Sequence, residues 1–522
     1  MTARSTDVQR SPRFLGLLAV AVHASTALAQ QLPEPTTLKC GDYTPISLEE
    51  LYGTGGPGNS FDRYRGVRSN GHSSVLVCGA LSDSPTVNNL WVSNGPASSF
   101  LIQAPVNDSR FLPRTIGTQA DISSQGSVVQ SSLIPRIPEL WDSGATGFAD
   151  TLWVHEWPAS GGTSMPGVPI GVDSTLAESL DAFWSAFGLV SVSPAGEPVY
   201  TASVSDELGD LSNLDLLIKG RLTPTSGQRI LQSGELLSSS VAVSLHAPVR
   251  KIAVAPTGGS VLAHVRLEPD NRGARDAVVH WMESSGTKSV IAEQGELLGD
   301  GMPGARWREF GPIAISEDDW ECGLSSWYVA GGVNSRRGDD WVLARNGSVL
   351  LKDGDALCND TLNGQPLALD VNRAGDYAVL WPTTPPSGTG RPLPTLIVNG
   401  FPIGRTGQQL SEHTYVSFIH PHVSISERGQ DGVVLCYAHA VLGNESNWEM
   451  AEFGDDAILV YVLEMNASST CRADFNRDGL VTSADIESFV GAWINELVDF
   501  NCDGHSDITD LQKYLDEWQI GC

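Results

Sequence analysis

Short apolar stretches alternate with polar turns along most of the chain, and the same order of features returns about every 60 residues between residues 38 and 467. Each unit has an apolar stretch, a polar turn, a β-rich strand, a variable loop, a third strand rich in Leu, Trp and Val, a tight turn and a last strand. A period of this length suits a four-stranded propeller blade. The first turn recurs as Ser69-Asn70-Gly71, Ser124-Gln125-Gly126, Pro194-Ala195-Gly196, Pro256-Thr257-Gly258, Glu317-Asp318-Asp319, Arg373-Ala374-Gly375 and Glu427-Arg428-Gly429.

The third strand of each unit can be located independently of these turns. It recurs as 89–93, 151–155, 214–219, 277–282, 340–344, 396–398 and 457–462. Asn94-Gly95, Asn346-Gly347 and Asn399-Gly400 follow three of these strands. Since Asn-Gly tolerates the positive φ angles of a two-residue hairpin, the third and fourth strands are expected to be antiparallel.

In the last unit no strand pattern follows Val462, so its outer strand is missing. The segment from Thr44 to Leu51 could supply that strand. We therefore predict a mainly β fold, a seven-bladed β-propeller of four-stranded blades over residues 38–467. A β-sandwich array or a β-solenoid would show a similar alternation of strands and turns, and both stay open as alternatives.

One heptapeptide connects these repeats to a known family. Residues 372–378 read Asn-Arg-Ala-Gly-Asp-Tyr-Ala, whereas Ser123 and Ser193 stand at the Asn position and Asp319 at the Gly position of other units. The repeats resemble the tandem Asn-x-x-Gly-x-x-Ala repeats of secreted bacterial proteins. That resemblance implies a β-propeller.

The C-terminal residues 471–522 contain two acidic loops in the same register, 25 residues apart. Oxygen donors recur at alternate positions of each loop, and Gly479 and Gly504 permit the sharp turn, which is the pattern that Ca²⁺ requires. We predict two Ca²⁺ sites. Their ligands are Asp474, Asn476, Asp478, the Leu480 carbonyl, Thr482 and Asp485 in the first loop, and Asp499, Asn501, Asp503, the His505 carbonyl, Asp507 and Asp510 in the second.

An apolar stripe typical of an amphipathic helix follows each loop, and the two stripes should pack together. The stripes are Ile486, Phe489, Val490 and Trp493, and Leu511, Tyr514, Leu515 and Trp518. The duplicated unit begins Cys-Arg-Ala-Asp-Phe-Asn and ends Gly-Cys. It resembles a dockerin domain of the Gly-Cys type, which implies a protein partner, cohesin-like or at the cell surface.

Two further features refine the dockerin-like module. Loop positions 10 and 11 hold Ser483-Ala484 and Ile508-Thr509 instead of a Ser-Thr pair, which argues against a standard cohesin as the partner. Cys471 and Cys522 bracket the module, and a disulfide between them would stabilise it by roughly 4 kcal/mol on the chain-entropy model. We predict that disulfide.

Residues 1–29 have Arg4, Arg10 and Arg13, an apolar run from Phe14 to Val22 and Ala27-Leu28-Ala29. This is the pattern of a secretory signal peptide, so we expect an extracellular or cell-surface protein. No later apolar stretch is long enough to span a membrane. The formal net charge of −29 argues against nucleic acid as a partner.

Motifs of high specificity for catalysis are absent from the sequence, and no catalytic residue is predicted. His413, His420, His422, His439 and Cys436 form the nearest approach to a metal or acid/base cluster, although isolated histidines on strands usually have structural roles. Tryptophans recur on the third strands, where blade packing explains them better than sugar stacking. They are Trp91, Trp153, Trp281 and Trp341.

The sequence therefore predicts an exported, non-catalytic binding or display protein, docked through a calcium-dependent dockerin-like module. One alternative is an extracellular polysaccharide-active hydrolase or lyase with its site in the propeller channel, since propellers host many activities. The other is a structural surface-layer component with no small ligand. A polysaccharide ligand at the propeller is compatible with the first two hypotheses.

Overall fold

The computed structural model describes most of residues 35–520. Outside the described residues lie 1–34, 53–60, 103–114, 136–147, 157–166, 206–213, 298–304, 317–324, 332–340, 385–390, 445–454, 466–474, 476–480, 495–507, 521–522 and loop segments of up to four residues. The expected signal peptide, the Cys471–Cys522 disulfide and His413 fall on these residues. No helix within the described ranges is long and apolar enough to cross a membrane.

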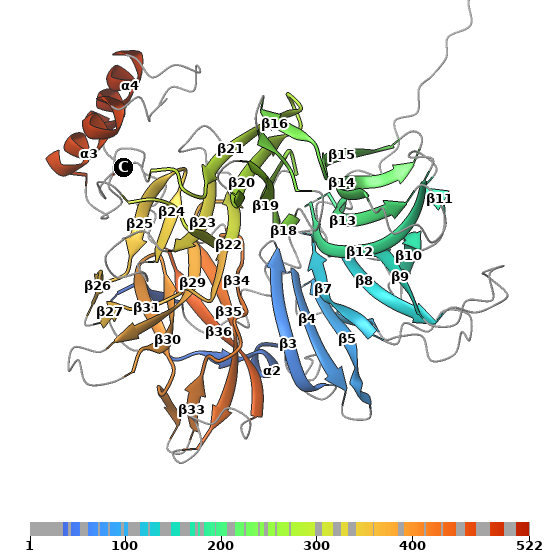
Figure 1. The fold of residues 1–522 in the computed structure, drawn as a ribbon. Coiled ribbons are helices and arrows are strands. Elements are labelled where there is room, and N and C mark those ends of the chain that lie inside the picture. Colours follow the sequence, from blue (N-terminus) through green and yellow to red (C-terminus); the bar gives the residue numbers. More distant parts are fainter. Residues whose placement is uncertain are drawn as a thin grey trace, which may run out of the picture.

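The fold is a β-propeller, built mostly from four-stranded antiparallel sheets that follow one another in chain order (Figure 1). The first three sheets are β3 (Phe61–Asn70), β4 (Ser74–Leu81), β5 (Ser84–Asn94) and β6 (Ser99–Ile102); β7 (Thr115–Ile122), β8 (Val128–Pro135), β9 (Phe148–His155) and β10 (Gly167–Val172); and β12 (Ala182–Val192), β13 (Pro198–Ser205), β14 (Leu214–Thr223) and β15 (Ser226–Gln232), with β11 (Leu176–Ala177) beside β12.

After a hairpin of β16 (Leu236–Ser238) and β17 (Val241–Ala242), three more sheets follow. They are β18 (Val249–Val254), β19 (Ser260–Asp270), β20 (Gly273–Met282) and β21 (Thr287–Glu293); β22 (Glu309–Ser316), β23 (Ser325–Gly331), β24 (Val342–Arg345) and β25 (Ser348–Lys352); and β28 (Ala368–Val371), β29 (Tyr377–Thr384), β30 (Leu393–Val398) and β31 (Phe401–Arg405), with β26 (Ala356–Leu357) and β27 (Asp360–Leu362).

The last sheet combines both ends of the repeat region. Its strands are β34 (Val423–Ile425), β35 (Val433–Gly443) and β36 (Asp455–Glu464), with β32 (Gln409–Ser411) and β33 (Thr414–Ser417) at one side and β1 (Thr36–Thr37) and β2 (Ile46–Ser47) at the other. Ile46 pairs with Val460 and Ser47 with Leu459, in antiparallel register. The predicted outer strand is confirmed, but it is short, because the chain turns into helix α2 (Leu48–Tyr52) directly after it.

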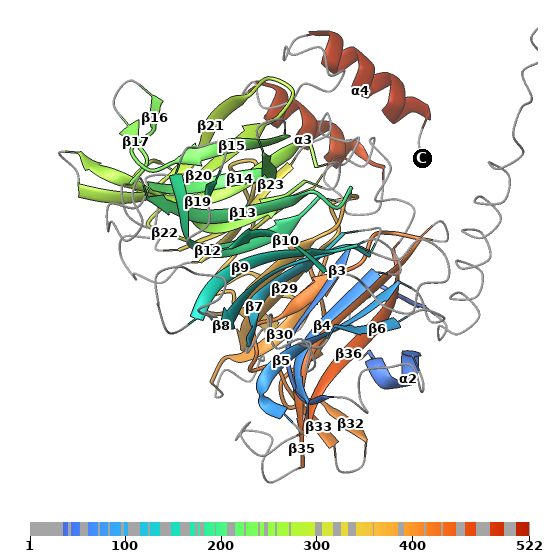
Figure 2. The ribbon, with the colours of Figure 1, turned by 90° about the vertical axis from the view of Figure 1, so that its right-hand side faces the viewer.

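The innermost strands surround a central axis. β3, β7, β12, β18, β22, β28 and β34 contact each other in this order, and β34 returns to contact β3. Ser69 at the end of β3 donates its backbone N–H to the Ser424 Oγ of β34, at 2.8 Å. Blue β3 and orange β36 accordingly lie near each other in Figures 1 and 2. This arrangement excludes the sandwich array and the solenoid.

The middle strands are apolar on both faces, because each sheet is covered by a sheet on either side. On β29, Ala378 and Leu380 pack with Leu459 of the last sheet, whereas Val379 and Trp381 pack on the opposite face with residues of β24. Trp91, Trp281 and Trp341 are buried, at 3%, 2% and 7% exposure, whereas Trp153 is only half-buried. The prediction of blade packing is confirmed for the first three.

Five of the seven predicted turns have their third residue among the described residues, and four of these follow the sequence pattern, whereas Gly71 and residues 317–319 lie outside the described residues. Gly126, Gly196, Gly258 and Gly375 have φ between +80° and +85°. In the last unit Gly432, with φ +79°, takes this place, and its N–H donates to the Gly429 carbonyl at 3.0 Å. The assignment to Gly429 was therefore wrong by three residues, because only Gly432 occupies the left-handed position.

The C-terminal region has two helices, α3 (Ser483–Ile494) and α4 (Ile508–Ile520). Phe489 and Tyr514 are fully buried, and their rings stack with centroids 3.9 Å apart. The remaining stripe residues pack around them, together with Phe475. The predicted packing of the two apolar stripes is confirmed.

Candidate ligand-binding channel

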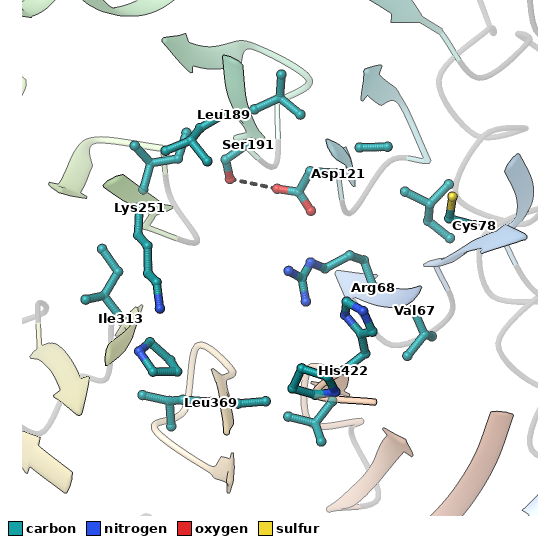
Figure 3. Close-up of a pocket in the computed structure, with 18 of the residues that line it drawn as sticks. Val67, Arg68, Cys78, Asp121, Leu189, Ser191, Lys251, Ile313, Leu369 and His422 are labelled. Atoms are coloured by element: carbon teal, nitrogen blue, oxygen red, sulfur yellow. Dashed lines mark hydrogen bonds between the residues drawn. The ribbon is translucent and has the colours of Figure 1, made fainter. Parts of the chain in front are cut away.

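A cavity of about 520 Å³ lies on the axis of the propeller (Figure 3). Each innermost strand, or the residues leading into it, contributes to its wall. Its wall combines apolar side chains, such as Val67, Leu189, Ile313 and Leu369, with about as much polar surface. A cavity of a few hundred Å³ that has apolar walls and polar groups pointing into it is a usual form of a small-molecule site.

Two cationic side chains extend into this cavity. Arg68 comes from β3 and Lys251 from β18, and Figure 3 shows them reaching inward from different sides. Neither makes a hydrogen bond or ion pair with another residue in the part of the chain that the structure describes. Burial lowers the pKa of Lys251, since the ammonium group loses water without gaining a carboxylate.

Arg250 and Asp121 are the other charged residues of the lining, and both have partners. Arg250 Nε lies 3.7 Å from Asp276 Oδ1. The carboxylate of Asp121 accepts hydrogen bonds from the Ser191 hydroxyl at 2.7 Å and the Val192 N–H at 3.0 Å. These bonds join β7 to β12, so we assign Asp121 a structural role.

Asp370 repeats this arrangement between β28 and β34. Its Oδ2 accepts hydrogen bonds from the Ser424 hydroxyl at 2.7 Å and the Ile425 N–H at 2.9 Å. Burial raises the pKa of both Asp121 and Asp370, and the positive charge of Arg68 and the hydrogen bonds that the two carboxylates accept oppose the shift. The innermost strands are thus linked by buried carboxylates.

A narrower cavity of about 160 Å³ continues along the axis and is lined by Asp370 and Glu427. Glu427 accepts hydrogen bonds from the Arg373 N–H at 3.0 and 3.1 Å. Burial nevertheless raises the pKa of Glu427 to about 7. Arg68 and Asp121 line both cavities, whereas Lys251 lines only the larger one and Asp370 and Glu427 only the smaller one.

Only part of the predicted calcium set falls on described residues. Asp485 and Asp510, the last ligands of the two loops, lie in the first turns of α3 and α4 and are fully buried. The Thr482 N–H donates to Asp485 Oδ2 at 2.7 Å. The other nine predicted ligands lie outside the described residues: Asp474, Asn476, Asp478, Leu480, Asp499, Asn501, Asp503, His505 and Asp507.

The structure divides the histidine group. His420 and His422 lie in a tight turn, where the His422 N–H donates to the His420 carbonyl at 2.8 Å, and the rings of both stack on His439. Cys436 is buried on the opposite face of β35, among residues such as Leu459 and Tyr461. His422 also lines the channel, and burial lowers its pKa to about 4.

Sequence reasoning missed Arg68 and Lys251. The available signal was a basic residue in the strand that precedes a repeat turn, in a chain that is strongly acidic. Ring closure was needed to show that both face one cavity, because they are far apart in the sequence.

Comparison with known proteins supports no assignment to a family. No family model and no curated protein matches the chain. Among solved structures, Trypanosoma rangeli sialidase has 11% identity and a TM-score of 0.33, with 89% of this chain and 62% of that protein covered. The chain thus spans less than two thirds of the length of that sialidase.

Two other structures are covered almost completely. Oligogalacturonate lyase from Vibrio parahaemolyticus has 10% identity and a TM-score of 0.38, over 82% of this chain and 97% of the lyase. Penicillium chrysogenum α-L-arabinanase has 8% identity and a TM-score of 0.32, over 81% of this chain and 98% of the arabinanase. At such values these similarities concern the propeller architecture alone.

Proposed function

We propose that this chain is an exported, non-catalytic binding protein, in which a seven-bladed propeller holds an anionic ligand in its channel. The observation that carries the proposal is the pair Arg68 and Lys251, which enter one cavity and make no hydrogen bond or ion pair with the described residues, although the charge of Arg68 acts on the buried carboxyls of Asp121 and Asp370. A count of seven blades is supported by seven sheets of four or more strands, whose innermost strands contact each other in a cycle.

Charge and volume define the ligand class. The chain carries a formal charge of −29, so two basic side chains without a salt bridge in one cavity on its axis favour an anion there. A guanidinium group and an ammonium group suit carboxylate or sulfate oxygens. A cavity of about 520 Å³ accommodates a ligand of one or a few sugar rings. We therefore propose an acidic saccharide as the ligand.

We further propose that residues 471–522 form a dockerin-like module that docks the propeller to a protein partner, cohesin-like or at the cell surface. Asp485 and Asp510, the last predicted ligands of the two loops, lie at the starts of α3 and α4, and this placement supports the proposal because Ca²⁺ takes carboxylate oxygens as ligands. The twelve ligands predicted above would hold two Ca²⁺ ions. Bound Ca²⁺ would neutralise the acidic loops and stabilise the helical pair.

Binding measurements test the channel. Isothermal titration would compare uronic-acid oligosaccharides with neutral oligosaccharides of equal length. Arg68→Ala and Lys251→Met should each weaken binding of the acidic ligand about 10- to 100-fold, the effect of losing one charge-assisted hydrogen bond. Arg308→Ala and Lys352→Met, which change basic residues outside the lining, serve as matched controls.

Two outcomes would contradict this assignment. Equal binding of acidic and neutral saccharides, or unchanged binding in both channel variants, would refute the anionic ligand. Cleavage of the saccharide would favour the hydrolase or lyase alternative. It would be measured as new reducing ends, and for a lyase also as ultraviolet absorbance. Absence of any small ligand would favour the structural surface-layer component.

A further inference from the structure

A buried histidine lies beside the channel, in the last sheet. The side chain of His439 on β35 is 1% exposed, and neither of its ring nitrogens has a hydrogen-bond partner within the described part of the protein. A polar group that is buried without a partner destabilises a fold. This suggests that the ring has a partner other than these protein groups.

Two further ligand-type side chains face His439. The ring of His420 stacks on it with centroids 4.3 Å apart and planes at 15°. The Asp456 Oδ1 lies 3.6 Å from His439 Nε2 and 4.0 Å from His420 Nε2. Ligand atoms of the three residues all lie within 4.8 Å of one another. Asp456 is only 16% exposed.

The fold holds this group together from three segments. In the ladder of β35 and β36, Val441 pairs with Asp456 and His439 with Ile458, so Asp456 lies diagonally opposite His439 on the same face. The His439 N–H donates to the His422 carbonyl at 3.0 Å, which fixes the turn that carries His420. Strand register and a backbone bond thus set the spacing.

We propose that His420, His439 and Asp456 bind a transition-metal ion of the Zn²⁺ type. Two imidazoles and one carboxylate are three protein ligands, which leaves one position of a tetrahedral ion for water or an exogenous ligand. Imidazole nitrogen selects such ions over Ca²⁺, which takes oxygen ligands, so this site is independent of the C-terminal loops.

The present spacing requires a small adjustment to coordinate an ion. Metal–ligand bonds of about 2.0–2.2 Å bring neighbouring ligand atoms of a tetrahedron to roughly 3.3–3.6 Å. The distance between His439 and Asp456 already agrees with that range. The nearly parallel ring of His420 must rotate to direct its nitrogen at the shared ion, and its side chain, at 41% exposure, has room to do so.

Metal binding to the untagged full chain tests the site. After chelation and transfer to buffer with saturating Ca²⁺, titration with ZnCl₂ should show one Zn²⁺ per chain, and Co²⁺ should give the visible absorption of a tetrahedral ion. His420→Ala and Asp456→Asn should each weaken Zn²⁺ binding by more than about 100-fold, since loss of residues that only support a ligand already costs up to that factor.

A histidine from another sheet provides the control. His280 on β20 is also buried with an unpartnered Nε2, and His280→Gln should leave Zn²⁺ binding unchanged. His420 is partly exposed, so His420→Ala should fold normally even if Asp456→Asn does not. Absence of stoichiometric Zn²⁺ binding, or binding by His420→Ala as tight as that of the wild type, would overturn the proposal.

Discussion

Replacement of Leu48 by alanine probes the closure of the propeller ring directly. Leu48 begins α2 and is fully buried, and Leu51 in the same helix is 4% exposed. Both belong to a cluster that contains Val460 of β36 and Val67 of β3. The short helix thus packs between β36 of the last sheet and β3 of the first sheet.

The structure sets the expected magnitude. A fully buried leucine that becomes alanine loses its transfer free energy and leaves a cavity, at a cost of about 2–5 kcal/mol. Leu48→Ala should lower the free energy of unfolding in urea by this amount. Leu236→Ala is the matched control, because Leu236 is 67% exposed, and it should change stability by no more than about 0.5 kcal/mol.

Hydrogen exchange makes this experiment specific to closure. If α2 holds β2 against β36, the amides of Ile46 and Val460, which are register partners, should exchange faster in Leu48→Ala than in the wild type. Exchange in the middle strands of the third and fourth sheets should change less. Equal stability of Leu48→Ala and Leu236→Ala would refute the reasoning.

Two other predictions concern charge. Removal of Ca²⁺ with EDTA should loosen the C-terminal helices, seen as lower helical circular dichroism and altered Trp518 fluorescence, and Asp474→Ala with Asp499→Ala should abolish calorimetric Ca²⁺ binding; an EDTA-insensitive module would contradict this. Glu427 has its pKa raised from 4.5 to about 7. Because the folded state then binds the proton more tightly than the unfolded state, the free energy of unfolding of the wild type should fall as the pH rises from about 4.5 to 7, by at most about 3 kcal/mol. Glu427→Gln should lack this slope in urea midpoints, so its stability relative to the wild type should rise from pH 5 to 8; parallel profiles would contradict the assignment.

The features that local physics determines could be predicted from the sequence. Asn346-Gly347 and Asn399-Gly400 do form two-residue hairpins, with φ of 48° and 88°, and of 47° and 82°. A glycine also follows the fourth strand of four sheets and has a positive φ there: Gly234, Gly295, Gly354 and Gly407. These positions can be predicted because few residues other than glycine and asparagine tolerate a positive φ angle.

The channel could not be predicted, because it depends on long-range geometry. Arg68, Asp121 and Lys251 belong to three different sheets and meet only after the ring closes. Asp456 is 17 residues away from His439 in the sequence, and strand register was needed to bring the two together. A repeat length predicts a blade but does not specify which residues face the axis.

The hydrogen bonds of the first residue in the turn explain why serine can replace asparagine in the Asn-x-x-Gly-x-x-Ala repeat. Asn372 Oδ1 accepts the Asp376 N–H at 2.9 Å, and its Nδ2 donates to the Ser426 carbonyl of the next sheet at 3.0 Å. Ser123 and Ser193 perform the first task with their hydroxyl oxygens, which accept the N–H four residues on at 3.0 and 3.1 Å.

A serine suffices at those turns because the adjacent sheets meet by packing there. An added Cβ on Gly258 would lie 3.0 Å from the Ser193 Cβ, and one on Gly196 would lie 3.3 Å from the Ser127 Oγ. A side chain in place of this glycine is therefore disfavoured for two reasons, the positive φ and the close approach of the neighbouring sheet. The first position of the repeat needs only a side-chain oxygen that accepts a backbone N–H. This explains why the glycine recurs more regularly along the chain than the asparagine.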